Sequence, residues 1–283
     1  MSGKRCIVTG GAAGIGIETA RALAASNAAV TLAVRRPNAA ERVATELRAS
    51  TANLAIDVRF VDLADLGSVR RFVDRWRGPL HILVNNAGIM AVPERELTRQ
   101  GFELQFATNF LGHFALTVWL HEALADACGA RIVSLSSSGH LFSPVVFDDL
   151  AFDFIPYSPI GAYGQSKTAT ALLAVGATQR WADQGIFANA VNPGAIATGL
   201  QKFTGGLKTP VEHRKTPEQG AATSVLAATS RLLDGIGGRY FEDCREALPV
   251  RRRPCDFSGG VAPYAIDADN AERLWDLALR AIQ

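Results

Sequence analysis

The chain has 283 residues and a formal net charge of +2, with 29 lysines and arginines against 27 aspartates and glutamates. This length suits one large α/β domain or two small ones. The balanced charge and the lack of a basic stripe interleaved with aromatic residues exclude the usual pattern of a nucleic-acid-binding protein, and no apolar run approaches the ~20 residues that span a bilayer.

The chain opens with "MSGKRCIVTGG", which passes directly into a predicted strand and turn. We therefore expect no signal peptide and a cytoplasmic location. The four cysteines form no CxxC pair and accompany no histidine cluster, so we expect free thiols and no metal site. A disulfide between Cys244 and Cys255 stays open. The only tight basic run, 251–253, is interpreted as a solvated loop.

Short β-branched runs alternate with longer helical stretches. Near-continuous apolar runs are typical of strands buried on both faces of a parallel sheet. We predict strands over 5–9, 29–34, 55–62, 80–86, 130–136 and 187–192. Helices are predicted near 15–26, 38–50, 66–76, 101–126, 161–184 and 269–282. This alternation predicts an α/β fold: a single Rossmann-type, doubly wound parallel sheet with helices on both faces, forming one domain over 1–283.

The first strand leads into "TGGAAGIG", residues 9–16. A glycine turn between a strand and a helix lets the backbone approach a pyrophosphate, and the helix N-terminus favours its charge. The spacing of Gly10, Gly14 and Gly16 differs from Gly-x-Gly-x-x-Gly, and Ile17 stands where a P-loop needs lysine. A glycine turn without a ligand is the alternative.

The second strand ends in "AVRRPN" and carries no carboxylate to bind the ribose diol of NAD. Arginine matches the 2′-phosphate of NADP with a planar charged fork, so we predict NADP(H) bound by Arg35 and Arg36. A pair of surface arginines is the alternative. Asp62, at the end of the third strand, would accept a hydrogen bond from the adenine amino group, or else cap a helix.

Two long segments interrupt the alternation. Residues 138–162 hold five of the chain's aromatic residues, which form an apolar pocket wall or pin the loop to the core. Residues 194–216 contain four glycines and no periodicity, so we predict a lid over the substrate. From 242 the pattern weakens into a C-terminal extension, 242–283.

Together these motifs resemble the short-chain dehydrogenases/reductases, over about residues 5–200. Within that family, "RIVSLSSSGH", "FDDL" and "AYGQSKTA" look like the retinol-dehydrogenase-like branch, which includes WW-domain oxidoreductases and bacterial ketoreductases. The matching segments, in family order, are "TGGAAGIG" (9–16), "DL" (62–63), "NNAG" (85–88), Asn109 in "TNFLGHF", Ser137 in "VSLSSSGH", "YGQSK" (163–167) and "NPGAIAT" (192–198).

Tyr163 and Lys167 lie four residues apart, on one face of the predicted helix. A phenol with a pKa near ~10 is a poor base at neutral pH. A nearby ammonium favours the phenolate, so we expect Lys167 to lower the pKa of Tyr163 and let it act as general acid or base. An ordinary surface pair is the alternative.

The resemblance implies further roles. Ser137 would stabilise the charge on the carbonyl oxygen, Lys167 would also bind the nicotinamide ribose, and Asn109 would hold a backbone and a water in a proton relay or serve only as a structural asparagine. The cofactor would contact Gly10, Gly14, Ile15, Gly16, Arg35, Arg36, Asp62, Leu63, Asn86, Ala87, Gly88, Tyr163, Lys167, Pro193, Gly194, Ile196 and Thr198.

Because ligands of open α/β sheets bind at the carboxyl ends of the strands, the substrate would meet Met90, His140, Leu141, Phe142, Leu200 and Phe203. For His140 a structural role is the alternative. We predict an NADPH-dependent reductase of lipophilic ketones or aldehydes, working reversibly on alcohols and assembling as a homodimer or homotetramer by family resemblance. The alternatives are an NAD(H)-dependent retinoid- or steroid-type dehydrogenase and a non-catalytic NADP(H) sensor.

Overall fold

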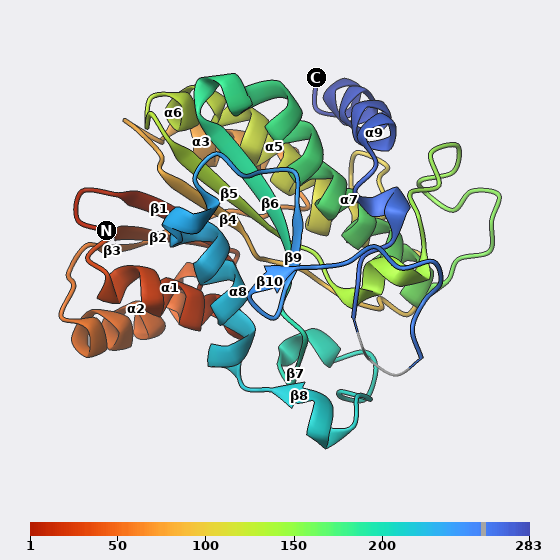
Figure 1. Ribbon diagram of the computed structural model, residues 1–283, viewed down its shortest axis with the longest axis horizontal. Coiled ribbons are helices and arrows are strands. Elements are labelled where there is room, and N and C mark those ends of the chain that lie inside the picture. Colours follow the sequence, from red (N-terminus) through yellow and green to blue (C-terminus); the bar gives the residue numbers. More distant parts are fainter. Residues whose placement is uncertain (256–258) are drawn as a thin grey trace.

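The computed structural model describes residues 1–255 and 259–283, in which an eight-stranded sheet lies between two layers of helices (Figure 1). The strand order is β10-β9-β6-β5-β4-β1-β2-β3, and every neighbouring pair is parallel except β9 with β10. The strands are β1 (Arg5–Thr9), β2 (Ala29–Val34), β3 (Ile56–Phe60), β4 (Ile82–Asn85), β5 (Ala130–Leu135), β6 (Ile186–Asn192), β9 (Tyr240–Glu242) and β10 (Arg245–Glu246). A small separate sheet pairs β7 (Ala195–Ile196) with β8 (Arg214–Lys215).

The predicted doubly wound fold is confirmed. The chain winds outward from β1 in both directions, so β1 and β4 are neighbours where the strand order reverses. Ligands of such sheets bind in the crevice at this point. All six predicted strands are present, each within two residues of its expected ends.

Each face of the sheet has its own apolar core. One core packs against α1 (Ile15–Ala25), α2 (Pro37–Thr51) and α8 (Pro217–Thr229). The other packs against α3 (Leu66–Asp74), α4 (Leu104–Phe106), α5 (Gly112–Trp119), α6 (His121–Ala125), α7 (Pro159–Trp181) and α9 (Ala268–Ala281). Short 3₁₀ segments are η2 (Ser138–Phe142), η3 (Ala182–Gln184), η4 (Gly199–Gln201), η5 (Val211–His213), η6 (Arg231–Leu233) and η7 (Pro263–Ala265).

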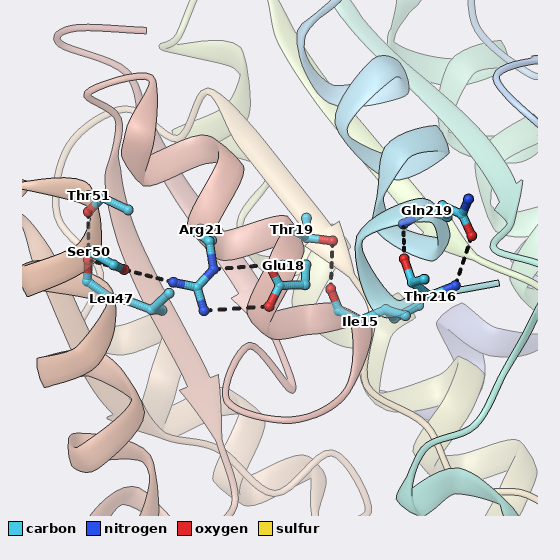
Figure 2. A network of polar contacts seen from close by, with 9 residues as sticks. All are labelled: Ile15, Glu18, Thr19, Arg21, Leu47, Ser50, Thr51, Thr216 and Gln219. Atoms are coloured by element: carbon cyan, nitrogen blue, oxygen red, sulfur yellow. Dashed lines mark hydrogen bonds and ion pairs between the residues drawn. The ribbon is translucent and has the colours of Figure 1, made fainter.

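Helix α1, which follows the glycine turn, is held between α2 and α8 (Figure 2). Arg21 pairs with Glu18 on α1 and donates to Ser50 on α2. On the other side, α8 begins with a reciprocal capping box between Thr216 and Gln219. A Cβ on Gly220 would lie 2.9 Å from Ile15, so a glycine lets α8 approach the start of α1 closely. These contacts hold the glycine turn in place.

The helix predicted over 101–126 is broken. It begins as α4, passes through a π-helical segment η1 (Ala107–Leu111) and continues as α5 and α6. The final helix, α9, was predicted over 269–282 and joins the core through aromatic contacts. The ring centroids of Phe114 and Trp275 lie 4.9 Å apart, and those of Trp275 and Trp181 lie 5.2 Å apart. Each such edge-to-face pair stabilises by about 0.5–1.5 kcal/mol beyond burial.

One part of the fold was not predicted, and one open alternative, the disulfide, is settled. Helix α8 and strands β9 and β10 were not predicted; the two strands extend the sheet at one edge, and α8 completes one helical layer. Cys244 and Cys255 are both free and exposed, so the pair forms no disulfide. Over residues 1–255 and 259–283, no helix is both long and apolar enough to cross a membrane.

Candidate active site

Helix α7 carries the central pair of side chains. It begins at Pro159 after Ser158, whose hydroxyl caps the helix by accepting from Gly161 N. Most of the helix is buried, and Tyr163 and Lys167 are only 5% and 4% exposed. The Lys167 ammonium lies 5.7 Å from the centroid of the Tyr163 ring. The helix therefore presents a phenol and an ammonium together in an environment with little water.

Lys167 links three parts of the site. Its Nζ donates to the Leu135 carbonyl at 2.8 Å, at the end of β5. A Cβ on Gly88 would lie 3.5 Å from Nζ and 3.2 Å from Asn109 Oδ1, so Gly88, Asn109 and Lys167 are neighbours. The ends of β4 and β5 and helix α7 thus converge at the crevice that the fold predicts.

Ser137 lies where β5 passes into η2, and its Oγ accepts from Gly139 N at 3.0 Å. It also hydrogen-bonds the Tyr163 hydroxyl. The neighbouring Ser136 is buried and donates to the Lys167 carbonyl at 2.8 Å, while Ser138 is exposed. Of the three consecutive serines, Ser137 is therefore the one placed beside Tyr163.

Asn109 lies in the π-helical segment η1, and such segments are frequent at functional sites. Its amide Oδ1 accepts from Ile89 N at 2.8 Å and its Nδ2 donates to Ile89 O at 2.9 Å, which fixes the loop after β4. Nδ2 also donates to Ser166 Oγ on α7 at 2.8 Å. Asn109 thus ties the loop after β4 to helix α7 through contacts that a structural asparagine makes, and its part in a proton relay stays a prediction.

Sequence reasoning missed His113, which is fully buried and extends this network. Its Nδ1 lies 2.8 Å from the Asn109 carbonyl and its Nε2 lies 2.8 Å from Thr9 Oγ1. Thr9 Oγ1 accepts from the backbone N–H groups of Asn86 and Ala87, and its own proton has two acceptors within reach, His113 Nε2 and the Val84 carbonyl at 3.3 Å. The signal in the sequence was the spacing, since His113 follows Asn109 by one helical turn.

The electrostatics differ from the expectation for Tyr163. Burial raises its pKa to about 12, and its hydrogen bond to Ser137 acts in the opposite direction. Burial also lowers the pKa of Lys167 from 10.5 to about 8. The prediction that Lys167 lowers the tyrosine pKa is thus not met here, because the cost of burying charge exceeds the attraction between the two groups. The arrangement holds a protonated phenol, ready to donate, across the neutral range.

The glycine turn has the shape that a dinucleotide pyrophosphate needs. Gly14 adopts a φ of 52° and precedes α1, whose N-terminus has no side-chain cap. A Cβ on Gly10 would lie 3.1 Å from Ala87 Cα, and one on Gly16 would lie 2.4 Å from the Gly10 carbonyl. Asn86 Oδ1 is buried without a hydrogen-bond partner among the described residues. A tight glycine turn, a helix N-terminus without a side-chain cap and an unsatisfied polar atom together fit a bound NAD(P).

At the adenosine end, Arg35 and Arg36 are both exposed after β2. Arg36 occupies the cap position of α2, where no side chain satisfies the helix amides. Asp62 does not cap α3, because Asp65 does so; Asp62 Oδ1 instead accepts from Ala64 N at 3.0 Å. The next residue, Leu63, is buried.

The segment 194–216 begins against the cofactor turn. Gly194 has a φ of 88°, a conformation suited to glycine, and follows the half-buried Pro193. Ile196 is buried, and a Cβ on Gly14 would lie 3.2 Å from the Thr198 side chain. Thr198 forms a capping box with Gln201 in η4. The base of the predicted lid is therefore ordered beside the pyrophosphate turn.

On the substrate side, Met90, Leu141 and Leu200 are half-buried, and Phe142 and Phe203 are 52% and 42% exposed. His140 is wholly buried, and its ring nitrogens meet the Ser137 carbonyl at 2.7 Å and Ala262 N at 3.0 Å. The expectation that His140 lines the pocket is therefore corrected in favour of the structural alternative, because protein groups occupy both nitrogens.

Most aromatic residues of 138–162 pack against other residues of this loop or against the core. Phe152 is buried against Tyr157 at 5.4 Å, and the Tyr157 hydroxyl donates to the Val92 carbonyl at 3.0 Å. Phe147 packs on the core, and Phe154 is exposed. Phe142 lies close to helix α7 beside Tyr163, since a Cβ on Gly164 would be 3.2 Å from its Cβ. Loop anchoring thus accounts for these residues better than a pocket wall.

A surface cavity of about 530 Å³ lies elsewhere, between the edge strand β3 and α3, and is lined by Asp57, Arg59, Phe60, Arg71 and Arg75 among others. None of the predicted site residues lines it.

Comparisons with known proteins agree with this arrangement. Residues 4–205 match the profile of a family described as short chain dehydrogenase. A "Probable oxidoreductase" from Streptomyces antibioticus is 50% identical over 100% of this chain and 99% of its own length. Retinol dehydrogenase 12 from Mus musculus is 37% identical over 98% of this chain and 86% of its own. A crystal structure from Mycobacterium paratuberculosis superposes with a TM-score of 0.78 at 33% identity, covering 99% of this chain and 94% of that one.

Proposed function

This chain belongs to the short-chain dehydrogenase family of NAD(P)-dependent oxidoreductases, and we propose that within it the protein is an NADPH-dependent reductase of lipophilic ketones and aldehydes. The observation that carries the proposal is the buried cluster of Tyr163, Ser137 and Lys167 beside the glycine turn. A protonated phenol next to a hydroxyl is suited to give a proton to a carbonyl oxygen.

The proposed step uses each residue in a defined way. When bound, the reduced nicotinamide supplies a hydride to the carbonyl carbon. Tyr163 donates its proton to the carbonyl oxygen, and Ser137 hydrogen-bonds that oxygen as negative charge develops. Lys167 holds its ammonium beside the resulting phenolate, and Asn109 keeps the β4 loop in register with α7. The product is an alcohol, and the reverse direction uses the tyrosinate as base.

Two observations favour NADPH and a lipophilic substrate. Two arginines and no carboxylate follow β2, where the adenosine ribose would lie. The residues proposed to face the substrate are Met90, Leu141, Phe142, Leu200 and Phe203, all of them apolar. One relative is named for retinol, a long polyene alcohol, so retinal belongs among the first substrates to test.

The test follows the loss of reduced-nicotinamide absorbance with NADPH and a panel of aliphatic, aromatic and polyene carbonyl compounds. We expect turnover of some members, and a loss of about 10²–10⁴-fold in kcat for a Tyr163→Phe variant that still binds NADPH. Full activity of Tyr163→Phe would refute the mechanism. Binding of NADPH without turnover of any compound would favour a cofactor sensor over an enzyme.

A further inference from the structure

Positive charge is concentrated in two segments on the substrate side. Residues 194–216 contain four basic residues and one acidic residue, and residues 247–255 contain three arginines and no acidic residue. Each segment alone carries at least the net charge of the whole chain, which is +2. Figure 1 shows both segments beside the carboxyl ends of the central strands, with β7 and β8 on one side and the chain after β10 on the other.

Arg253 stands over an aromatic ring beside the catalytic helix. Its guanidinium carbon lies 4.5 Å from the centroid of Phe142. Phe142 in turn packs against Gly164, the residue that follows Tyr163. Arg253 therefore lies over an exposed ring whose Cβ neighbours the residue after Tyr163, on the side of the molecule where we expect the substrate.

The segment that carries Arg253 is anchored at its base. Val250 N donates to the Val261 carbonyl at 2.9 Å, and Gly260 N donates to Glu242 at 2.6 Å. Ala262 N donates to His140 Nε2 at 3.0 Å, which joins this segment to the turn after Ser137.

A second cation, in the predicted lid 194–216, also lies over an aromatic ring. Lys202 Nζ lies 4.1 Å from the centroid of Phe203, just after η4. Neither Lys202 nor Arg253 forms an ion pair with another described residue, whereas Lys215 of the same lid is paired with Asp243. Two cations without a carboxylate partner among the described residues, each on an exposed aromatic face, can receive an anionic group while the rings contact an apolar chain.

We propose that the substrate is a lipophilic oxo compound whose end distal to the carbonyl carries a carboxylate or a phosphate, bound by Arg253 and Lys202. This inference rests on the proposed reductase function. The carbonyl would lie at Tyr163, the chain would pass over Phe142 and Phe203, and the anion would remain at the partly hydrated rim. The source of the anion is either a free acid or the phosphate of a carrier group.

The test compares three substrates of one chain length with NADPH: a long-chain oxo acid, its methyl ester and the corresponding oxo alkyl phosphate. We expect kcat/KM to favour an anionic member over the ester, and the preference to shrink as salt is added. The preferred anion identifies the source. Arg253→Gln and Lys202→Gln should each reduce the preference by roughly threefold to fivefold, as expected of a partly exposed ion pair, while the ester rate stays unchanged.

Arg273→Gln is the matched control, because its guanidinium also stacks on an aromatic ring, Phe147 at 4.3 Å, but outside the site. This variant should keep the full preference. Equal rates for acid, phosphate and ester would overturn the inference and leave the reductase function standing. Absence of turnover for all three, with NADPH bound, would overturn both. The inference alone would also be overturned if Arg253→Gln and Lys202→Gln both retained the wild-type preference for the anionic substrate.

Discussion

His140 Nε2 accepts a hydrogen bond from the backbone N–H of Ala262 at 3.0 Å, joining the turn after Ser137 to a segment 122 residues further along the chain. Because the Ser137 carbonyl can only accept, Nδ1 carries the proton, and the imidazole is neutral with a defined tautomer. The Tyr240 hydroxyl lies 3.1 Å from the same Nδ1. A buried histidine thereby links the catalytic turn, strand β9 and the C-terminal segment.

The first prediction concerns this link. His140→Leu fills the space with an apolar side chain, leaves the Ala262 N–H buried without its partner and removes one of the two hydrogen bonds to the Ser137 carbonyl, which keeps the backbone N–H of residue 140. An unpaired buried donor costs about 1–3 kcal/mol and a lost hydrogen bond about 1 kcal/mol, so we expect the free energy of unfolding in urea to fall by about 2–4 kcal/mol. Tyr240→Phe removes only one partner and should cost about 1 kcal/mol. His140→Leu as stable as the wild type would contradict this account.

The second prediction is a loss of stability in acid. Burial lowers the pKa values of His113 and His140 from 6.5 to about 4. Between these values the unfolded chain binds protons that the folded chain does not, so the free energy of unfolding falls as pH decreases from 6.5 to 4. Each histidine contributes up to about 3 kcal/mol to this loss.

Urea unfolding at pH 7.5, 5.5 and 4.5 measures this loss. Carboxylates also make the free energy of unfolding depend on pH, so the comparison is between variants. His113→Gln should reduce the slope of stability against pH between 6.5 and 4 relative to the wild type. An unchanged slope for His113→Gln would mean that this histidine is protonated in the fold.

The third prediction concerns activity at high pH. With the pKa of Lys167 near 8 and that of Tyr163 near 12, the lysine loses its charge first as pH rises. We expect kcat/KM for carbonyl reduction to fall with a one-proton dependence above about pH 8. Lys167→Arg keeps its charge throughout this range, so its profile should lack this limb, although its kcat will be lower. A limb at the same pH in Lys167→Arg would assign it to another group.

The sequence was sufficient to predict strands β1 to β6 because most of them are buried apolar runs, and the chemistry expected of Tyr163, Lys167 and Gly14 has local signatures. It was insufficient for α8, where small residues such as Gly220 replace an apolar stripe and packing depends on close approach. The capping box of Thr216 and Gln219, followed by a proline at the first turn, was a usable signal for that helix.

The roles of His113 and His140 could not be predicted for a different reason. Their partners lie 104 and 122 residues away in the chain, at Thr9 and Ala262. A pattern confined to one element carries no information on such contacts. The predicted direction of the Tyr163 pKa shift was wrong for a related reason. The shift is dominated by burial of the phenol, and that burial depends on elements distant in the sequence.

The fourth prediction tests cofactor preference. Arg35→Ser and Arg36→Ser each remove a cation at the end of β2, and a lost charged hydrogen bond of about 1.5–3 kcal/mol raises the KM for NADPH by roughly 10- to 100-fold. The KM for NADH should change little. Arg42→Ser, on the exposed side of α2, is the control. A wild-type enzyme that prefers NADH would refute the role proposed for both arginines.

The fifth prediction tests the proposed lid. Lys202, Lys208 and Arg214 are exposed in the 194–216 segment and are sites for trypsin. The base of the segment touches the cofactor turn, where a Cβ on Gly14 would lie 3.2 Å from Thr198. Binding of NADPH at that turn should therefore stabilise the segment and slow its cleavage several-fold, because proteolysis tracks the population of open conformations. Cleavage after Arg99, exposed in a loop before α4, provides the internal control and should keep its rate. Mass spectrometry of timed digests separates the two rates, and equal protection at both sites, or none at either, would show that the segment does not close over the cofactor.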